Sequence, residues 1–187
     1  MQLFTRAFAP TEIGLLMNHA PMAAPVSDAA ILAGRTLLVT NTATDPDLPA
    51  QTLRWSLLNS AAGVSLNATN GQLVWRPAIN QAGTTNLLTL RVVDNGTPSL
   101  SATQAFIVTV TRPASPLLTL AKFDQAAFRM SLSGEVGPDY LIYAATNLSQ
   151  PDWSLLLATN PVAFPFQFID SSATNLRQRY YRVLLGP

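Results

Sequence analysis

The sequence predicts an all-β protein made of two consecutive small antiparallel β-sandwich domains. Short runs rich in Val, Leu, Thr and aromatic residues recur between turn signals, whereas helical periodicity with caps is hard to find beyond a few residues. Only 11% of the 187 residues are charged, so Thr, Ser, Asn and Gln supply most of the polarity, which suits strands better than surface helices. A hydrophobic content of 48% is ample for two cores.

Five runs in the first half are expected to be strands. Asn70-Gly71 favours a reversal between two of them, since glycine adopts positive φ cheaply, and Asn95-Gly96 favours another. Trp55 and Trp75 are the natural large residues for the core of a two-sheet sandwich. The five runs are 36–42, 53–58, 71–76, 86–93 and 104–111. In the last two, the side chains expected on one face each are Leu88, Leu90 and Val92, and Phe106, Val108 and Val110.

A domain boundary is predicted at residues 112–116, where two prolines that cannot donate ladder hydrogen bonds follow an expected strand. The predicted parts are an arm or remnant of a preceding module (1–17), a first sandwich (18–113), a linker (114–116) and a second sandwich (117–187). The second sandwich is expected to contain six strands, at 117–123, 127–133, 140–145, 153–158, 164–169 and 179–185.

Charge and composition exclude several classes of function. A net charge of +1 without a basic run gives no footprint for nucleic acid, so we expect no nucleic-acid partner. No apolar run approaches the roughly 20 residues that span a bilayer, so we expect no membrane insertion. With no cysteine, thiolate chemistry is excluded. Pro10 and Glu12 interrupt the apolar stretch near the start, and we expect no signal peptide there.

Side chains capable of catalysis are few, and we expect no enzyme. His19 is the single imidazole and precedes the first sandwich, so we interpret it as a junction residue rather than part of a catalytic triad. The clustered acids of the second half, Glu135, Asp139 and Asp152, lie in or beside predicted turns, which favours solvated turn residues over a glycosidase pair.

Six motifs occur in the order typical of one family. They are Asn18-His19-Ala20-Pro21, Gly34-Arg35-Thr36-Leu37, the acidic turn 43–47, and the segments 53–57, 70–77 and 93–101. With these motifs the span 18–113 resembles the immunoglobulin-like and cadherin-like modules of large secreted and surface proteins of bacteria. The resemblance implies a β-sandwich, an extracellular or cell-surface location, and a spacer, adhesion or interaction role beside other modules or surface proteins.

In cadherin-like modules the acidic turns help to ligate calcium, so the resemblance implies Asp45, Asp47 and Asp94 as metal ligands. The sequence departs from the pattern at Ala33, where a glutamate is expected, and at 112–116, where an acidic linker is expected. These losses weaken a calcium site and favour the second interpretation given below; if calcium binds, we expect an affinity no tighter than about 0.1 to 1 mM. The alternative is that the three aspartates only make Asx-type turns that hold backbone N–H groups.

The span 117–187 looks like a C-terminal β module of exported bacterial proteins, on the strength of Gly134, the segment 140–148, Trp153 and the segment 179–183. Its architecture is expected to be fibronectin type III-like, by analogy. Together the two resemblances imply a non-catalytic module at the C-terminal end of a longer protein. The alternative is a glycan-binding accessory module of a polysaccharide-degrading enzyme. Its stacking platform would come from Tyr140, Tyr143, Trp153, Phe164, Phe166, Phe168, Tyr180 and Tyr181.

Overall fold

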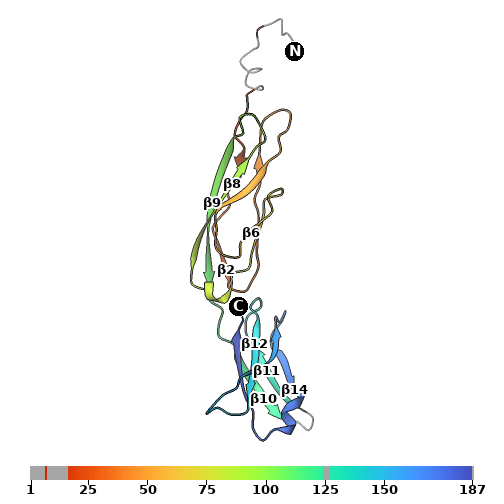
Figure 1. Ribbon diagram of the computed structural model, residues 1–187. Coiled ribbons are helices and arrows are strands. Elements are labelled where there is room, and N and C mark those ends of the chain that lie inside the picture. Colours follow the sequence, from red (N-terminus) through yellow and green to blue (C-terminus); the bar gives the residue numbers. More distant parts are fainter. Residues whose placement is uncertain (1–6, 8–16, 124–126, 187) are drawn as a thin grey trace. The chain divides into compact units, whose positions relative to one another are not determined.

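The computed structural model describes residues 7, 17–123 and 127–186, and these residues form an all-β protein (Figure 1). The five sheets fall into two groups, one made of strands β1 to β9 and one of strands β10 to β15, and no sheet of the described residues joins strands of both. The helices among these residues are two short 3-10 turns, η1 (Ile79–Gln81) and η2 (Ser171–Asn175). No helix in the described ranges is long and apolar enough to cross a membrane. The predicted fold class is confirmed.

The chain divides into two compact units. The first takes its described residues from 1–29, 37–75 and 85–108, and the second from 30–36, 76–84 and 109–187. The second unit thus includes short segments that precede residue 114. The domain boundary at residues 112–116 therefore stays a prediction.

The first strand group contains three sheets. One has the order β2-β9-β8-β5, with β2 at Ala29–Leu32, β9 at Ser101–Thr111, β8 at Thr85–Val93 and β5 at Arg54–Asn59. The second has the order β3-β7-β6, with β3 at Leu37–Thr40, β7 at Gln72–Trp75 and β6 at Ser65–Leu66. The third pairs β1 (Met22–Ala23) with β4 (Ala43–Thr44). Pairing of β5 with β8, β3 with β7, and β6 with β7 is antiparallel.

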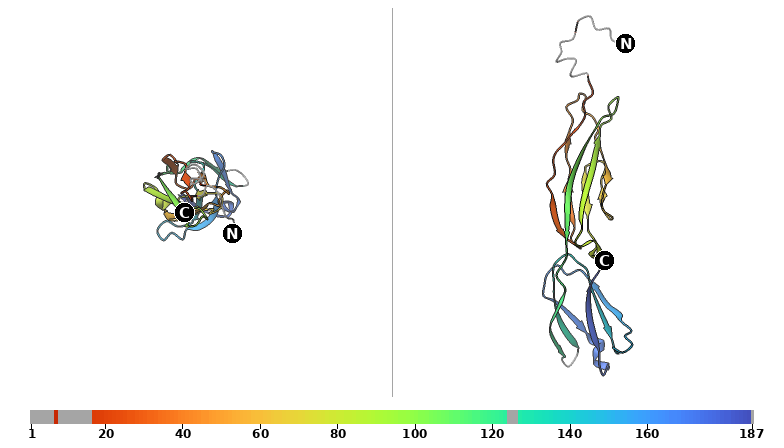
Figure 2. Two further views of the ribbon diagram at one scale, coloured as in Figure 1. Left: turned by 90° about the horizontal axis from the view of Figure 1, so that it is seen from above. Right: turned by 90° about the vertical axis from the view of Figure 1, so that its left-hand side faces the viewer.

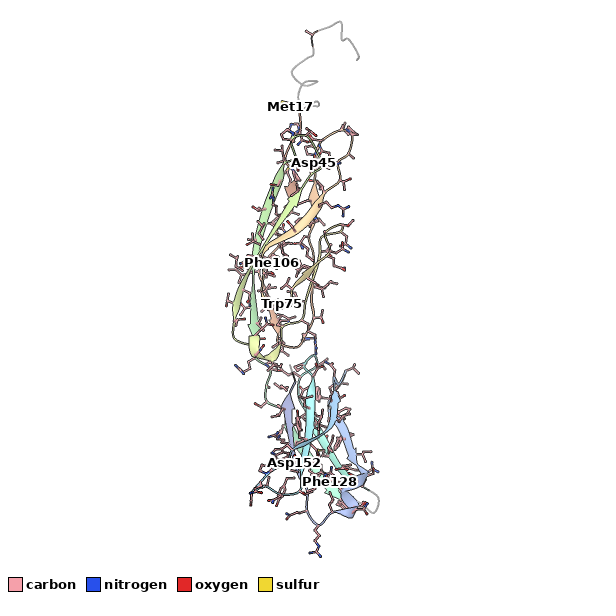
Figure 3. The ribbon with its side chains drawn as sticks, in the orientation of Figure 1. Met17, Asp45, Trp75, Phe106, Phe128 and Asp152 are labelled. Carbon is pink, nitrogen blue, oxygen red and sulfur yellow. The ribbon has the colours of Figure 1, made fainter. Side chains whose placement is uncertain are left out.

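The core of this group follows the predicted alternation. Trp75 is fully buried and donates from Nε1 to the Ala62 carbonyl at 3.1 Å, and Trp55 is 6% exposed. Figure 3 places Trp75 and Phe106 in the interior of the group. The inward faces of β8 and β9 are those predicted, because Leu88, Leu90, Val92, Phe106, Val108 and Val110 are all at most 2% exposed.

Four strands of this group were not predicted. Strands β1, β4 and β6 have two residues each, which is too short for an alternating pattern to show. Strand β2 has four residues, and its burial does not alternate cleanly. All four depend on pairing with a partner strand rather than on a local pattern, so the sequence carries little signal for them.

The second strand group contains two three-stranded antiparallel sheets. One has the order β10-β11-β14, with β10 at Leu117–Phe123, β11 at Phe128–Ser133 and β14 at Phe166–Asp170. The other has the order β13-β12-β15, with β13 at Ser154–Thr159, β12 at Tyr140–Ala145 and β15 at Tyr180–Leu185. Met130 and Phe168 from the first sheet pack with Ile142 from the second, so the two sheets enclose a shared core (Figure 2). This is a sandwich, as predicted.

The predicted strand 164–169 begins two residues late, at Phe166. Pro165 has no N–H to give to a ladder, so pairing starts after it. Phe164 instead packs edge-on against the buried Tyr140, with ring centroids 5.3 Å apart. The other five predicted strands of this group agree with the structure to within about one residue at each end, the usual uncertainty of a strand boundary.

Candidate functional site

The first acidic turn follows strand β4 and is closed by its own aspartates. Asp45 Oδ1 accepts a hydrogen bond from the Asp47 backbone N–H at 3.0 Å, which is an Asx turn. Asp47 is only 7% exposed. It accepts from the backbone N–H of His19 at 2.8 Å through Oδ2, and its Oδ1 lies 2.6 Å from His19 Nδ1. The first acidic turn is therefore fastened to the segment that precedes β1.

The second acidic turn connects β8 to β9 and is organised by Asp94, which is 5% exposed. Asp94 Oδ1 accepts from the backbone N–H of Gly96 at 3.0 Å and of Leu100 at 2.8 Å. The Ser99 hydroxyl donates to the Asp94 carbonyl at 2.9 Å. Asp94 thus fixes both ends of the loop that reverses the chain, which is the turn role considered above as an alternative to calcium binding.

Two amide side chains link the acidic turns. Asn18 Nδ2 donates to the Pro98 carbonyl at 2.7 Å and makes a longer contact of 3.4 Å with Asp94 Oδ2. Gln51 Nε2 donates to Asp47 Oδ2 at 2.8 Å and also to Asn18 Oδ1. Figure 3 shows Met17 and Asp45 at the same end of this strand group. The set is called the acidic-turn cluster below and consists of Asn18, His19, Asp45, Asp47, Gln51 and Asp94.

His19 also sets the electrostatics of the cluster. The hydrogen bond from its backbone N–H is the largest influence on Asp47 and lowers the pKa of that carboxyl. Burial acts in the opposite direction, and the His19 side chain lowers the pKa further through its hydrogen bond and charge. Together these effects hold the pKa of Asp47 below its ordinary value, so the Asp47 carboxyl is ionised at neutral pH.

The arrangement does not fit a calcium ion as it stands. Ca²⁺ takes six to eight oxygen ligands, but both oxygens of Asp47 and one of Asp94 already accept from N–H groups, whose positive hydrogens point where a cation would bind. Among the side chains of the acidic-turn cluster, the buried oxygens without a hydrogen-bond donor are Asp45 Oδ2 and Gln51 Oε1. Within residues 7, 17–123 and 127–186, no three His, Cys, Asp or Glu side chains gather as a metal site. The calcium role of Asp45, Asp47 and Asp94 stays a prediction that requires these donors to move.

Sequence reasoning missed three members of the cluster: Asn18, His19 and Gln51. His19 lies where the chain enters the strand group, as expected of a junction residue, yet it also contacts an aspartate 28 positions away. The Asn18 contact with Asp94 spans 76 positions. In the sequence, Asn18 and His19 are indicated only by the motif Asn18-His19-Ala20-Pro21. The motif is typical of a junction between modules but does not show which residues Asn18 and His19 contact.

The contact between His19 and Asp47 has the geometry of the orienting half of a catalytic triad. A triad needs a nucleophile hydrogen-bonded to the other ring nitrogen. No Ser, Thr or Cys side chain in the described part of the chain makes that bond, and the His19 side chain is 48% exposed. The contact by itself therefore carries no acyl-transfer chemistry.

A second polar network lies in the other strand group and centres on Asp170, the last residue of β14. Asp170 caps η2 by accepting from the Ser172 N–H at 3.0 Å and the Ser172 hydroxyl at 2.7 Å. It also accepts from the Tyr181 hydroxyl at 2.9 Å and pairs with Arg179 at 3.2 Å. Tyr181 stacks on Phe128 with ring centroids 4.7 Å apart. This buried aspartate was not among the predicted site residues, because a capping role depends on a helix turn that the sequence did not reveal.

Burial acts to raise the pKa of Asp170, but the hydrogen bonds from Ser172 and Tyr181, together with the charge of Arg179, outweigh it and hold the pKa below its usual value. The hydrogen bond between Tyr181 and Asp170 has the opposite effect on the Tyr181 hydroxyl, whose pKa it raises. Burial first, then the hydrogen bond to Asp170, raise the pKa of Tyr181 well above its ordinary value. The network therefore favours a charged Asp170 and a neutral Tyr181.

The predicted aromatic platform is largely used inside the protein. Tyr140 is fully buried and Phe168 is 8% exposed. Tyr143 and Trp153 behave differently, because the guanidinium of Arg182 lies 5.0 Å from the ring centroid of Tyr143 and 4.3 Å from that of Trp153. Tyr143 and Arg182 face each other across β12 and β15, on the side of the sheet opposite the buried Ile142. Tyr180 and Tyr181 are both half-buried.

No protein-family model and no curated protein matches the chain. Among solved structures, the chain is similar to a nucleoside hydrolase-related hypothetical protein of Saccharophagus degradans that is associated with carbohydrate metabolism, at 25% identity over 50% of this chain and 26% of that one, with a TM-score of 0.41. It is also similar to the segment EC21-23 of human CDH23, at 17% identity over 62% of this chain and 45% of that one, with a TM-score of 0.44.

A third similar structure is the third cadherin domain of human protocadherin 7, at 14% identity over 50% of this chain and 87% of that one, with a TM-score of 0.40. The chain therefore spans about a quarter and under a half of the length of the first two proteins. Cadherin domains are thus among the solved structures to which the chain is similar. The fibronectin type III analogy for residues 117–187 stays a prediction.

Proposed function

We propose that the chain is a non-catalytic spacer and interaction module of a larger extracellular or cell-surface protein, whose other modules are its partners. The observation that supports this most is how the polar side chains of the acidic-turn cluster are used. Asp47 and Asp94 are nearly buried, and each is held by N–H donors that close a turn or fasten a segment. A catalytic acid or base must exchange a proton with a substrate, whereas these carboxylates are committed to the fold.

A spacer has to stay folded under mechanical load, and the long pair of hydrogen-bonded strands in the first strand group suits this. Strands β8 and β9 have nine and eleven residues and are neighbours in the sheet, where Figure 1 shows them side by side. Their inward side chains are fully or almost fully buried. Separating the two strands breaks many hydrogen bonds and exposes an apolar face at the same time, so the group should yield in one cooperative event.

Single-molecule pulling from the two ends of the chain tests this proposal. We expect separate, abrupt unfolding events for the group β1 to β9 and for the group β10 to β15. Gradual extension without abrupt events would contradict a load-bearing role. An enzyme assay is the complementary test, and turnover of a polysaccharide or ester substrate by the purified chain would contradict the non-catalytic part of the proposal.

A second candidate function is glycan binding, and the arrangement of Tyr143, Arg182 and Trp153 favours it. Two aromatic rings flank a guanidinium on the outward side of the sheet β13-β12-β15. Aromatic rings stack on sugar faces, and a guanidinium suits the carboxylate of an acidic sugar. Binding would concern the face of β12 that does not contribute to the core.

A pull-down on insoluble polysaccharides, neutral and uronate-containing, tests this second candidate. We expect Trp153→Ala to abolish retention on an acidic polysaccharide. The matched control is Phe123→Ala, since Phe123 is 60% exposed but belongs to β10 in the other sheet, and it should leave retention unchanged. Absence of binding by the unaltered protein across the whole panel would remove glycan binding as a function.

A further inference from the structure

Two carboxylates at one end of the first strand group are almost withdrawn from water. Asp47 is 7% exposed and Asp94 is 5% exposed. Both are close to the segment where the chain enters the group, through hydrogen bonds to Asn18 and His19. A buried carboxylate is strongly unfavourable unless donors or a positive charge compensate it. What compensates these two therefore decides how this end of the molecule is held together.

Protein groups supply the compensation for Asp47. His19 offers two donors, with its backbone N–H at 2.8 Å from Oδ2 and its ring Nδ1 at 2.6 Å from Oδ1. Gln51 Nε2 adds a third at 2.8 Å. Hydrogen bonds to an ionised carboxylate are about twice as strong as neutral ones. Both carboxylate oxygens of Asp47 therefore have hydrogen-bond donors. Two of these donors belong to His19, in the segment that enters the strand group.

Protein groups also satisfy Asp94. Two backbone N–H groups of its own loop donate to Oδ1, and Asn18 lies within 3.4 Å of Oδ2. Asn18 is fixed in turn by its 2.7 Å bond to the Pro98 carbonyl. Gly96 allows this approach, because a Cβ at position 96 would collide with the Asn18 side chain. Asn18 and His19 thus fasten the two acidic turns to one entering segment.

We propose that Asn18 and His19 form a cation-independent lock, in which His19 takes the position on Asp47 that a metal ion would need, so that the entering segment is held to the strand group without calcium. The proposal replaces the calcium role that the sequence resemblance implies for Asp45, Asp47 and Asp94. It rests on the contacts of the cluster and does not depend on the spacer function.

Amide hydrogen exchange of the full chain, with EDTA and then with millimolar CaCl₂, tests the lock. The His19 amide donates to Asp47 and reports on the lock directly, whereas the amides of Asp47, Gly96 and Leu100 report on the two acidic turns that the lock fastens. We expect these amides to be protected in EDTA and to exchange at the same rate after calcium is added. Exchange in EDTA at the rate of an unstructured peptide, or protection that appears only with calcium, would overturn the proposal.

A pair of variants separates the lock from general stability. In His19→Ala the ring donor is lost, and we expect exchange at positions 19 and 47 to accelerate about tenfold or more, because a bond to a charged group is lost. The control is Met22→Ala, three residues further along and 69% exposed, which should leave these rates unchanged. Strand β8 should keep its protection in both variants, which shows that the fold persists. Unchanged exchange in His19→Ala would overturn the role assigned to His19.

Discussion

The hydroxyl of Tyr181 donates a 2.9 Å hydrogen bond to Asp170, at the point where β15 passes the end of β14. Asp170 at the same time caps η2 through Ser172. One side-chain contact therefore joins a strand from each sheet of the second group to the turn that connects them. The stability of this group should depend on that contact more than on any exposed polar pair.

Removing the hydroxyl of Tyr181 should destabilise the second strand group. Tyr181→Phe keeps the ring that stacks on Phe128 but leaves Asp170 with one donor fewer. We expect the free energy of unfolding to fall by about 1.5 to 3 kcal/mol, as for the loss of other hydrogen bonds to a charged group. Amide hydrogen exchange in β14 and β15 measures it. Tyr180→Phe is the control, because its hydroxyl makes only a 3.5 Å contact with Gln178, and an equal loss in the two variants would contradict the account.

The same contact predicts how stability depends on pH. Because the pKa of Asp170 is lowered in the folded protein, its contribution is complete above the ordinary aspartate value of about 4 and is lost as the pH falls through the lowered value. Because the pKa of Tyr181 is raised, its contribution is complete below about 10 and is lost as the pH rises further. The second strand group should weaken at both extremes.

Urea unfolding at a series of pH values, read from exchange of the β14 and β15 amides, measures this dependence. Tyr181→Phe should reduce the loss of stability at alkaline pH, and Asp170→Asn should reduce the loss of stability at acid pH. If Asp170→Asn reproduces the full acid dependence of the unaltered protein, other carboxylates are responsible and the assignment to Asp170 is wrong.

Close approach of Gly96 to Asn18 predicts a coupled pair. Gly96→Ala places a methyl group where the Asn18 side chain lies and should destabilise the first strand group by about 1 to 3 kcal/mol through overpacking. Asn18→Ala has a cost of its own from the lost contacts with Pro98 and Asp94, but in that background the extra cost of Gly96→Ala should largely disappear, because the collision is removed. A double-mutant cycle of urea unfolding energies gives the coupling. Additive costs would show that the glycine is needed for another reason.

Adjacent leucines of β8 predict a sharp contrast. Leu88 is fully buried, whereas Leu87 points to the other side of the sheet and is 51% exposed. Leu88→Ala should lower the free energy of unfolding by about 2 to 5 kcal/mol, because buried apolar atoms are removed and a cavity remains. Leu87→Ala should lie within about 0.5 kcal/mol of the unaltered protein. Thermal and urea unfolding of the pair measure the difference, and similar losses would mean that the assigned face of β8 is wrong.

The sequence predicts the long strands well because their side chains alternate between core and solvent, and this local pattern survives in β8 and β9 whatever the rest of the chain does. It fails for β1, β4 and β6, because their two residues each are too few for an alternating pattern to show. The turn aspartates were recognised, since Asp45 and Asp94 act on backbone groups a few residues away. Their long-range partners Asn18 and His19 were not, because nothing local in either residue indicates a contact across the fold.

In the proposed lock, protein donors rather than a cation hold the acidic turns. Two-dimensional amide NMR of the full chain during a calcium titration tests it most directly. We predict that the amide signals of residues 18–19, 45, 47, 94–97 and 99–100 stay in place from EDTA to millimolar calcium. Saturable shifts confined to these residues would contradict the claim and would restore Asp45, Asp47 and Asp94 as calcium ligands.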